Sequence, residues 1–169
     1  ESLSFQLIPR LNAAGRVGDA SVSLKLLTSD SPDDARSLVE TLETYNRKRR
    51  FLSQEALEEA HRQVDRKPNS LPHMIIVQHE KWLPGILGLI ASSLAEHYNR
   101  PAIAIRCENE VSRASARSVP GFDIVASLER CKYLFHRVGG HPQAAGFTLP
   151  TINLPWLTEN LMKDAKDKL

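Results

Sequence analysis

Cysteine is scarce in this chain of 169 residues, which holds only Cys107 and Cys131 and no CxxC pair. Two distant thiols cannot form a disulfide framework of the kind that supports small secreted domains, and they lack the spacing of a zinc knuckle. We interpret both as packing residues rather than nucleophiles. This cysteine usage suits a reducing compartment, so the sequence predicts a cytoplasmic protein.

Long apolar runs are also missing. No stretch approaches the roughly 20 residues that a membrane span requires, so we expect no membrane partner. The first residues, Glu1 to Phe5, lack the basic and then apolar pattern of a signal peptide. The chain starts without a methionine, and we therefore expect it to be a fragment of a longer protein.

A strong charge of one sign is absent as well, since the formal net charge is only +2. Any contact with nucleic acid must therefore come from local clusters of arginine and lysine. The chain shows no metal-ligand spacing, and the acids Asp30, Asp33 and Asp34 are explained by the start of a helix. No two-metal carboxylate set can be assembled, so we predict no metal site among these residues. The histidines to which we assign no role are His61, His73, His79, His97 and His136.

The chain divides into three regions. Residues 1–30 form an opening segment, with irregular structure through Leu11–Arg16 and a short helix over Ala20–Leu27. Gly15 and Gly18 are expected to interrupt regular structure before that helix, and Asp19 can serve as its N-cap.

Residues 31–68 are predicted to form one long linker helix. Ser31 and Pro32 provide a capping hydroxyl and a first-turn proline, and apolar residues recur afterwards at helical spacing. Lys67 and Pro68 mark the expected end. About 32 residues at 1.5 Å per residue give a rod of about 48 Å, which we interpret as a spacer between two bodies.

Residues 69–169 alternate strands and helices. A strand at 74–77, a helix at 84–98 and a strand at 102–105 predict a right-handed parallel crossover. An antiparallel strand follows at 111–117, then a helix near 123–131, a glycine-rich loop, a strand at 145–149 and a closing helix. The predicted fold class is α/β, a compact domain whose mixed β-sheet is flanked by helices.

The strand at 111–117 carries the first candidate site. Alternate side chains of a strand share one face, so Arg113, Ser115 and Arg117 point to the same side. Two guanidinium groups flanking a hydroxyl suit phosphate oxygens. A solvated strand face explains the same pattern equally well, because exposed arginine is common.

The second candidate site is Gly139-Gly140-His141. Adjacent glycines allow backbone N–H groups to converge on an anion, and His141 can donate to a phosphate or place a scissile group. An ordinary glycine turn with an incidental histidine is the simpler explanation of these three residues alone.

Two basic segments are weaker candidates. Asn12 and Arg16 are separated by small residues, which a flexible loop also explains. The run Arg47–Arg50 has the charge to follow a nucleic-acid backbone. A solvated helix face paired with acids such as Glu43 is the more common arrangement.

In combination and in this order, the segments resemble one family. The chain is similar to the C-terminal part of the core of RecJ-type single-stranded-DNA exonucleases, within the DHH/DHHA1 phosphoesterase superfamily. The resemblance covers nearly the whole chain, and its most specific element is the last one. It is carried by NAAGR at 12–16, NRKRR at 46–50, WLPGILG at 82–88, SARSVPGF at 115–122 and GGHPQAAG at 139–146.

The resemblance implies a DHHA1-like domain that holds a DNA strand, and a separate DHH domain that binds Mn²⁺ or Mg²⁺ through motifs absent from this sequence. It implies that Arg16, Ser115 and Arg117 hold a phosphate and that His141 is a catalytic residue facing the scissile group. The family often has glycine where this chain has Ala114 and Ala116, and we expect these methyl groups to narrow the approach. The predicted phosphate-binding set further includes Asn12, Arg113, Ser118, Gly139 and Gly140.

We therefore expect the longer parent to be a metal-dependent 5′→3′ exonuclease of DNA repair and recombination. This chain would be its monomeric substrate-binding fragment, which binds single-stranded DNA and is inactive alone. Two alternatives stay open. The parent is an oligoribonuclease or nucleotide phosphatase of the same superfamily, or the chain belongs to a non-catalytic single-strand-binding replication module.

Overall fold

The computed structural model describes residues 6–66 and 71–169. The chain forms two compact units, residues 1–55 and 56–169, and the long helix α3 (Pro32–Asp65) contributes to both. The predicted helix end at Lys67 and Pro68 lies outside the described residues.

The first unit contains α1 (Ile8–Val17), α2 (Ser21–Leu27) and the first part of α3. The irregular structure predicted through Leu11–Arg16 is wrong, because these residues lie in α1. A proline in the first turn starts α1. Gly15 lies inside the helix, whereas Gly18 is its C-cap: its N–H still bonds the Ala14 carbonyl at 2.9 Å, but its own backbone is no longer helical. The helix forms because Ala13 and Ala14 are fully buried, and this packing outweighs the low propensity of asparagine and glycine.

Polar contacts fix the helices of the first unit to one another. The Arg10 side chain forms an ion pair with Glu43 of α3, and the Ser23 hydroxyl donates to the Leu11 carbonyl at 2.7 Å. The carboxylate of Asp19 accepts the backbone N–H of Ser21 at 2.9 Å, but the N-cap position of α2 is Ala20, so the predicted N-cap is wrong by one residue.

The second unit is built on a five-stranded mixed sheet in the order β1-β2-β3-β5-β4. β1 and β2 are parallel and are joined through α4 (Pro84–Tyr98), which confirms the parallel pairing of the predicted crossover. The remaining neighbours are antiparallel. The strands are β1 (Ile75–Gln78), β2 (Ala102–Arg106), β3 (Val111–Arg117), β4 (Arg137–His141) and β5 (Ala144–Pro150).

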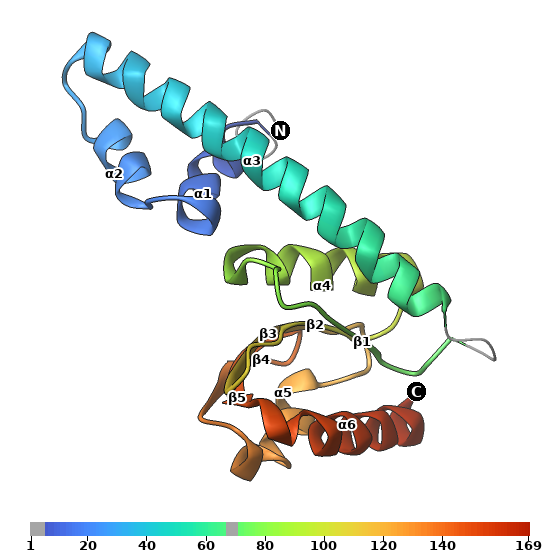
Figure 1. Cartoon of the computed structure of the whole chain (residues 1–169). Coiled ribbons are helices and arrows are strands. Elements are labelled where there is room, and N and C mark those ends of the chain that lie inside the picture. Colours follow the sequence, from blue (N-terminus) through green and yellow to red (C-terminus); the bar gives the residue numbers. More distant parts are fainter. Residues whose placement is uncertain (1–5, 67–70) are drawn as a thin grey trace. The chain divides into compact units, whose positions relative to one another are not determined.

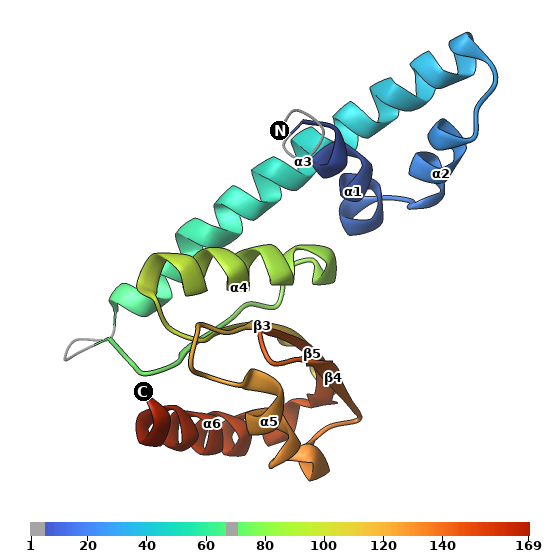
Figure 2. The same cartoon turned by 180° about the vertical axis from the view of Figure 1, so that it is seen from behind.

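Helices cover both faces of this sheet. α4 lies on one face, and α5 (Ile124–Glu129) and α6 (Leu154–Lys168) lie on the other (Figures 1 and 2). The main core fills the space between the sheet and α5 and α6, with Phe147 and Leu149 from β5 and Leu128 and Leu161 from the helices. The α/β class and the long preceding helix are as predicted.

The glycine-rich loop predicted before residue 145 is wrong, because Gly139, Gly140 and His141 end strand β4. A two-residue turn, Pro142–Gln143, connects β4 to β5. Gly140 has φ +154, and a β-carbon there would lie 2.3 Å from the Ala144 carbonyl oxygen. This glycine therefore permits close approach of two strands and does not form an open anion loop.

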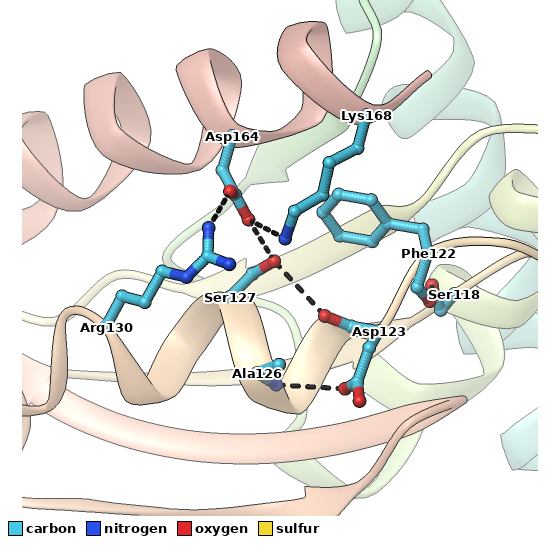
Figure 3. Close-up of polar contacts among 8 residues, drawn as sticks. All are labelled: Ser118, Phe122, Asp123, Ala126, Ser127, Arg130, Asp164 and Lys168. Atoms are coloured by element: carbon cyan, nitrogen blue, oxygen red, sulfur yellow. Dashed lines mark hydrogen bonds and ion pairs between the residues drawn. The ribbon is translucent and has the colours of Figure 1, made fainter.

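Asp164 joins α6 to α5 (Figure 3). Its carboxylate accepts hydrogen bonds from the Ser127 hydroxyl and from Lys168, the latter at 2.8 Å, and it pairs with Arg130. Burial alone raises the pKa of Asp164, but these hydrogen bonds and cationic neighbours outweigh it and hold the pKa below its usual value. The network fixes the two helices that form the far side of the core.

Candidate nucleic-acid interface

The α4 side of the sheet carries three rows of side chains that cross β3, β5 and β4. Directly paired residues of antiparallel strands project to the same face, so each row is a set of neighbours. The rows are Arg117–Ala144–His141, Ser115–Gly146–Gly139 and Arg113–Thr148–Arg137. The sheet register therefore gathers most of the predicted phosphate-binding residues of the second unit on one face.

The alternation predicted for β3 is confirmed. Arg113 is exposed and Ser115 and Arg117 are half-buried, whereas Ser112, Ala114 and Ala116 are buried. The expectation that the methyl groups of Ala114 and Ala116 narrow the approach is wrong. These methyl groups point into the core on the opposite face, so they leave the arginine face unobstructed.

Arg117 lies against α4. A β-carbon at Gly88 would stand 2.9 Å from its Nη2 atom, and its Nη1 donates to the Ala116 carbonyl at 2.8 Å. The missing side chain at position 88 therefore leaves room for the guanidinium group between helix and sheet. Arg117 also lines a hollow of ≈ 270 Å³ with Ser118 and Val119.

The imidazole of His141 stands at the exposed end of β4. Its Nδ1 accepts the backbone N–H of Gln143 at 3.4 Å. With Nδ1 as acceptor, the proton of the neutral ring is on Nε2, which is then a donor. His141 and Arg117 thus project to one face, from positions that both pair with Ala144 on β5.

The floor of the face between Arg113 and Arg117 is formed by Gly146 and Gly139 of the middle row, which carry no side chains. A β-carbon at Gly139 would meet nothing within 4 Å, and one at Gly146 would meet only the Ala114 carbonyl oxygen, at 3.7 Å. Side chains would therefore fit at both positions, and their absence exposes the backbone of β4 and β5. This exposed backbone allows a ligand to lie flat on β4 and β5.

Ser118 follows β3 in a loop. Its hydroxyl donates to the Phe122 carbonyl at 2.6 Å, and its N–H donates to the Gln143 carbonyl at 2.9 Å. The residue thus connects the end of β3 to the β4–β5 turn. Its role as a phosphate ligand stays a prediction.

Asn12 and Arg16 belong to the first unit, one helical turn apart on α1. Arg49 of α3 lies close enough to Arg16 for the two charges to interact. Burial, followed by the charges of Arg16 and Arg50, lowers the pKa of Arg49. Its Nη2 donates to Asn46 at 2.9 Å. The expected pairing of the Arg47–Arg50 run with Glu43 is wrong, because Glu43 pairs with Arg10.

The described part of the chain, residues 6–66 and 71–169, contains no cluster of three histidine, cysteine, aspartate or glutamate residues that could hold a metal ion. Burial raises the pKa of both the Cys107 and the Cys131 thiol. Cys131 is buried in the core, and Cys107 is half-buried with its thiol directed at the Gln78 side-chain oxygen at 3.3 Å. Within these same ranges, no helix has the length and apolarity of a membrane span.

Residues 72–169, which form the sheet with its three rows and the helices on both faces, match the DHHA1 domain family. The chain therefore belongs to the DHHA1 domain family, as the motif resemblance implied.

Curated relatives extend the match beyond the domain. The chain is similar to the single-stranded-DNA-specific exonuclease RecJ of Bacillus subtilis, with 34% identity over 100% of this chain and 22% of that protein. The RecJ of Escherichia coli is 36% identical over 87% of this chain and 27% of its own length. The chain thus spans about a quarter of the length of these curated relatives.

Solved structures agree. RecJ from Thermus thermophilus in complex with Mg²⁺ superposes with a TM-score of 0.87 at 28% identity. The superposition covers 98% of this chain and 26% of that one. The same protein has also been solved with Mn²⁺, again with a TM-score of 0.87. Because the described residues offer no fitting ligand set, no metal position is assigned to this chain.

The structure adds four residues to those that the sequence indicated. Gly88 makes room for Arg117, Gly146 bares the floor, and Arg137 and Thr148 complete the third row. A glycine inside an otherwise apolar helix was the available signal for Gly88. Arg137 and Thr148 could be found only once β4 was recognised as a strand paired with β5.

Proposed function

We propose that this chain is the strand-binding part of a 5′→3′ single-stranded-DNA exonuclease, like the relatives that it matches. The observation that carries the proposal is the shared face of Arg117, Ser115 and His141. The register of β3, β5 and β4 supports this placement independently of any loop conformation. A phosphodiester group over the Arg117–Ala144–His141 row would meet cationic or neutral donors from two strands at once.

The chemistry of binding follows from these donors. The guanidinium group of Arg117 offers a planar fork of N–H groups that matches two phosphate oxygens. The Ser115 hydroxyl, 3.9 Å from a β-carbon built on Gly88, lies beside Arg117 under α4. The Nε2–H of His141 would donate from the opposite side. In this role, the chain would bind and orient the phosphate, and these donors would compensate the negative charge of the phosphate during the reaction.

Cleavage itself requires groups that the described residues do not supply. We propose that Mn²⁺ or Mg²⁺ is held by another domain of the longer protein, as in the family, and that the metal supplies the activated water. Arg16 and Asn12 of α1 would add phosphate contacts from the first unit. The isolated chain should then bind single strands and hydrolyse none.

The test measures binding and turnover of the same chain. Fluorescent oligothymidylates of two to sixteen nucleotides are titrated in EDTA, and 5′-labelled strands are incubated with Mn²⁺. Affinity that rises with strand length, without turnover, supports the proposal. Affinity that is the same for a dinucleotide and a long strand favours the small-substrate phosphatase. Turnover by the chain alone contradicts its assignment as a binding part.

An Arg117→Gln variant makes the test residue-specific. The loss of one bidentate phosphate contact should weaken strand binding by roughly tenfold to a hundredfold. Lys166→Gln is the matched control, because it removes one exposed positive charge from α6, on the opposite side of the sheet. If both variants bind as the unchanged chain does, Arg117 holds no phosphate.

A further inference from the structure

The third row, Arg113–Thr148–Arg137, has no role in the first phosphate site. Arg113 of β3 and Arg137 of β4 pair with the same residue of β5, Thr148, so both project to the α4 side of the sheet. Both arginines are exposed and Thr148 is half-buried between them. Neighbouring strands lie about 4.8 Å apart, which places the two arginine backbones roughly 9.6 Å from each other.

A hollow of ≈ 290 Å³ opens at this row. Arg113, Arg137 and Thr148 contribute to its wall, together with Ser115, Gly146 and the first turn of α4 at Pro84 and Leu87. None of the described residues that line it is acidic. The hollow therefore has a positive lining that also includes the two hydroxyl residues Ser115 and Thr148.

The charges of the two arginines are not compensated within the described part of the chain, where neither Arg113 nor Arg137 has an ion pair or a side-chain hydrogen bond. Arg106 of β2 occupies the next position of the same row, paired with Arg113, and shows the contrast. It forms a 2.7 Å ion pair with Glu108. Two like charges that flank a hollow without a carboxylate are placed to share an external anion.

We infer that the row Arg113–Thr148–Arg137 is a second phosphate site, which binds a phosphodiester further along the same strand than the one over Arg117 and His141. The inference rests on the proposed function, and it assigns the direction of the nucleic-acid strand, which runs along β3, β5 and β4 from one row to the other. The two rows are separated by two ladder steps of two residues each along β3, with the bare glycine row between them. At about 3.4 Å per residue, the rows lie roughly 13.6 Å apart along β3.

The site is tested with Arg137→Gln, with Thr148→Val as a second variant of nearly conserved volume and Lys166→Gln as the charge-matched control. Binding is measured in EDTA to a set of 5′-phosphorylated oligothymidylates that each carry one uncharged methylphosphonate linkage at a different position. The unchanged chain should lose affinity by about tenfold when the methylphosphonate replaces the phosphate held by the third row.

The expected result is a position-specific loss of sensitivity. Arg137→Gln should bind the fully charged strand about tenfold more weakly than the unchanged chain does. Its affinity should not fall further when a methylphosphonate replaces the phosphate at that one linkage. It should keep full sensitivity at the linkage over Arg117. Thr148→Val should show a smaller loss at the same linkage, and Lys166→Gln should match the unchanged chain throughout.

Two results overturn the inference and leave the proposed function intact. One is an Arg137→Gln variant that binds every strand as Lys166→Gln does. The other is a variant that weakens all strands equally, which would mean a general field effect rather than a site. If the unchanged chain binds no single strand at all, the proposed function itself fails, and this site fails with it.

Discussion

Gly88 of helix α4 lies directly over the guanidinium group of Arg117, where a β-carbon would come within 2.9 Å of Nη2. Glycine within a helix ordinarily costs stability, by about 0.5–1 kcal/mol relative to alanine. Glycine at position 88 therefore lowers the stability of α4 and leaves room for the Arg117 side chain. Such a loss of stability is expected at a position that serves binding.

The Gly88→Ala variant should separate stability from binding. The added methyl group displaces the far end of a flexible side chain, so we expect the free energy of unfolding to stay constant or to rise by up to about 1 kcal/mol. Affinity for a single-stranded oligonucleotide should fall by roughly tenfold, because the Arg117 fork is moved from its place. Denaturant unfolding and fluorescence anisotropy measure the two quantities.

Ser93→Ala is the control on the same helix, because Ser93 is not among the residues that line the hollow at Arg117. If Gly88→Ala binds as tightly as Ser93→Ala, the position of the Arg117 guanidinium group is irrelevant to the ligand.

The adjacent glycines of β4 should respond in opposite ways to alanine. Gly139 faces open space, so Gly139→Ala should fold with at least unchanged stability. Gly140 has φ +154 and a β-carbon there would clash with the Ala144 carbonyl, so Gly140→Ala should cost about 2 kcal/mol or more. Thermal unfolding of the two variants decides this, and equal melting temperatures would contradict the assigned strand geometry.

Gly146→Val should fill the floor between the arginines. The nearest obstacle to its first carbon is the Ala114 carbonyl oxygen at 3.7 Å, so the strand can accept the side chain. Valine favours strands, and the variant should be as stable as the unchanged chain. Strand affinity should fall by about tenfold or more as the branched side chain excludes a flat ligand. Retained affinity in a folded variant would show that the ligand does not cross β5.

Asp164 should give the second unit an acid-sensitive stability. The pKa of its carboxyl group is lowered in the fold, so its contribution is present above the unfolded value of about 3.8 and is lost as the pH falls through the lower folded pKa. Asp164→Asn should lower the free energy of unfolding by roughly 1 kcal/mol at pH 7. That difference should shrink as the pH falls below about 4.

Asp167→Asn, an exposed neighbour on α6, is the control for general charge effects. A difference between the Asp164 variant and the unchanged chain that is constant from pH 7 to pH 2 would show that this carboxylate is not the titrating group.

Arg16→Gln tests the first unit. Arg16 and Arg49 lie close enough for their charges to repel, which a bound phosphate between or beside them would relieve. We expect Arg16→Gln to weaken strand binding by about tenfold and to reduce the slope of log K against log salt by about 0.7. Lys25→Gln, an exposed cation of the same unit outside the candidate segments, should change both quantities less. Equal effects of the two substitutions would remove Arg16 from the site.

The sequence predicted those helices and strands whose apolar and polar residues follow a regular pattern. β3 was found at its observed bounds because its small and polar residues alternate, and α4 was found because a proline starts a continuous apolar segment. The α/β class followed from the strand–helix–strand order of the crossover. In each case, local propensity and burial pattern agree with the final fold.

Two elements were missed for identifiable reasons. α1 contains asparagine and glycine, and its helical state depends on the burial of Ala13 and Ala14, which the sequence does not reveal. β4 has almost no buried side chain, so it lacks alternation, and its paired glycines resemble a turn. Since Arg137 and the third row depend on the pairing of β4 with β5, this half of the site could not be predicted.

Because hydrogen bonds between β3, β5 and β4 set the positions of the arginines, binding competence should be lost all at once rather than by degrees. A slip of β4 by a single residue would turn its Arg137 and His141 inward and present Val138 and Gly140 instead. No intermediate register keeps the donors aligned. Heating or denaturant should therefore abolish strand capture in the same cooperative transition that melts the sheet.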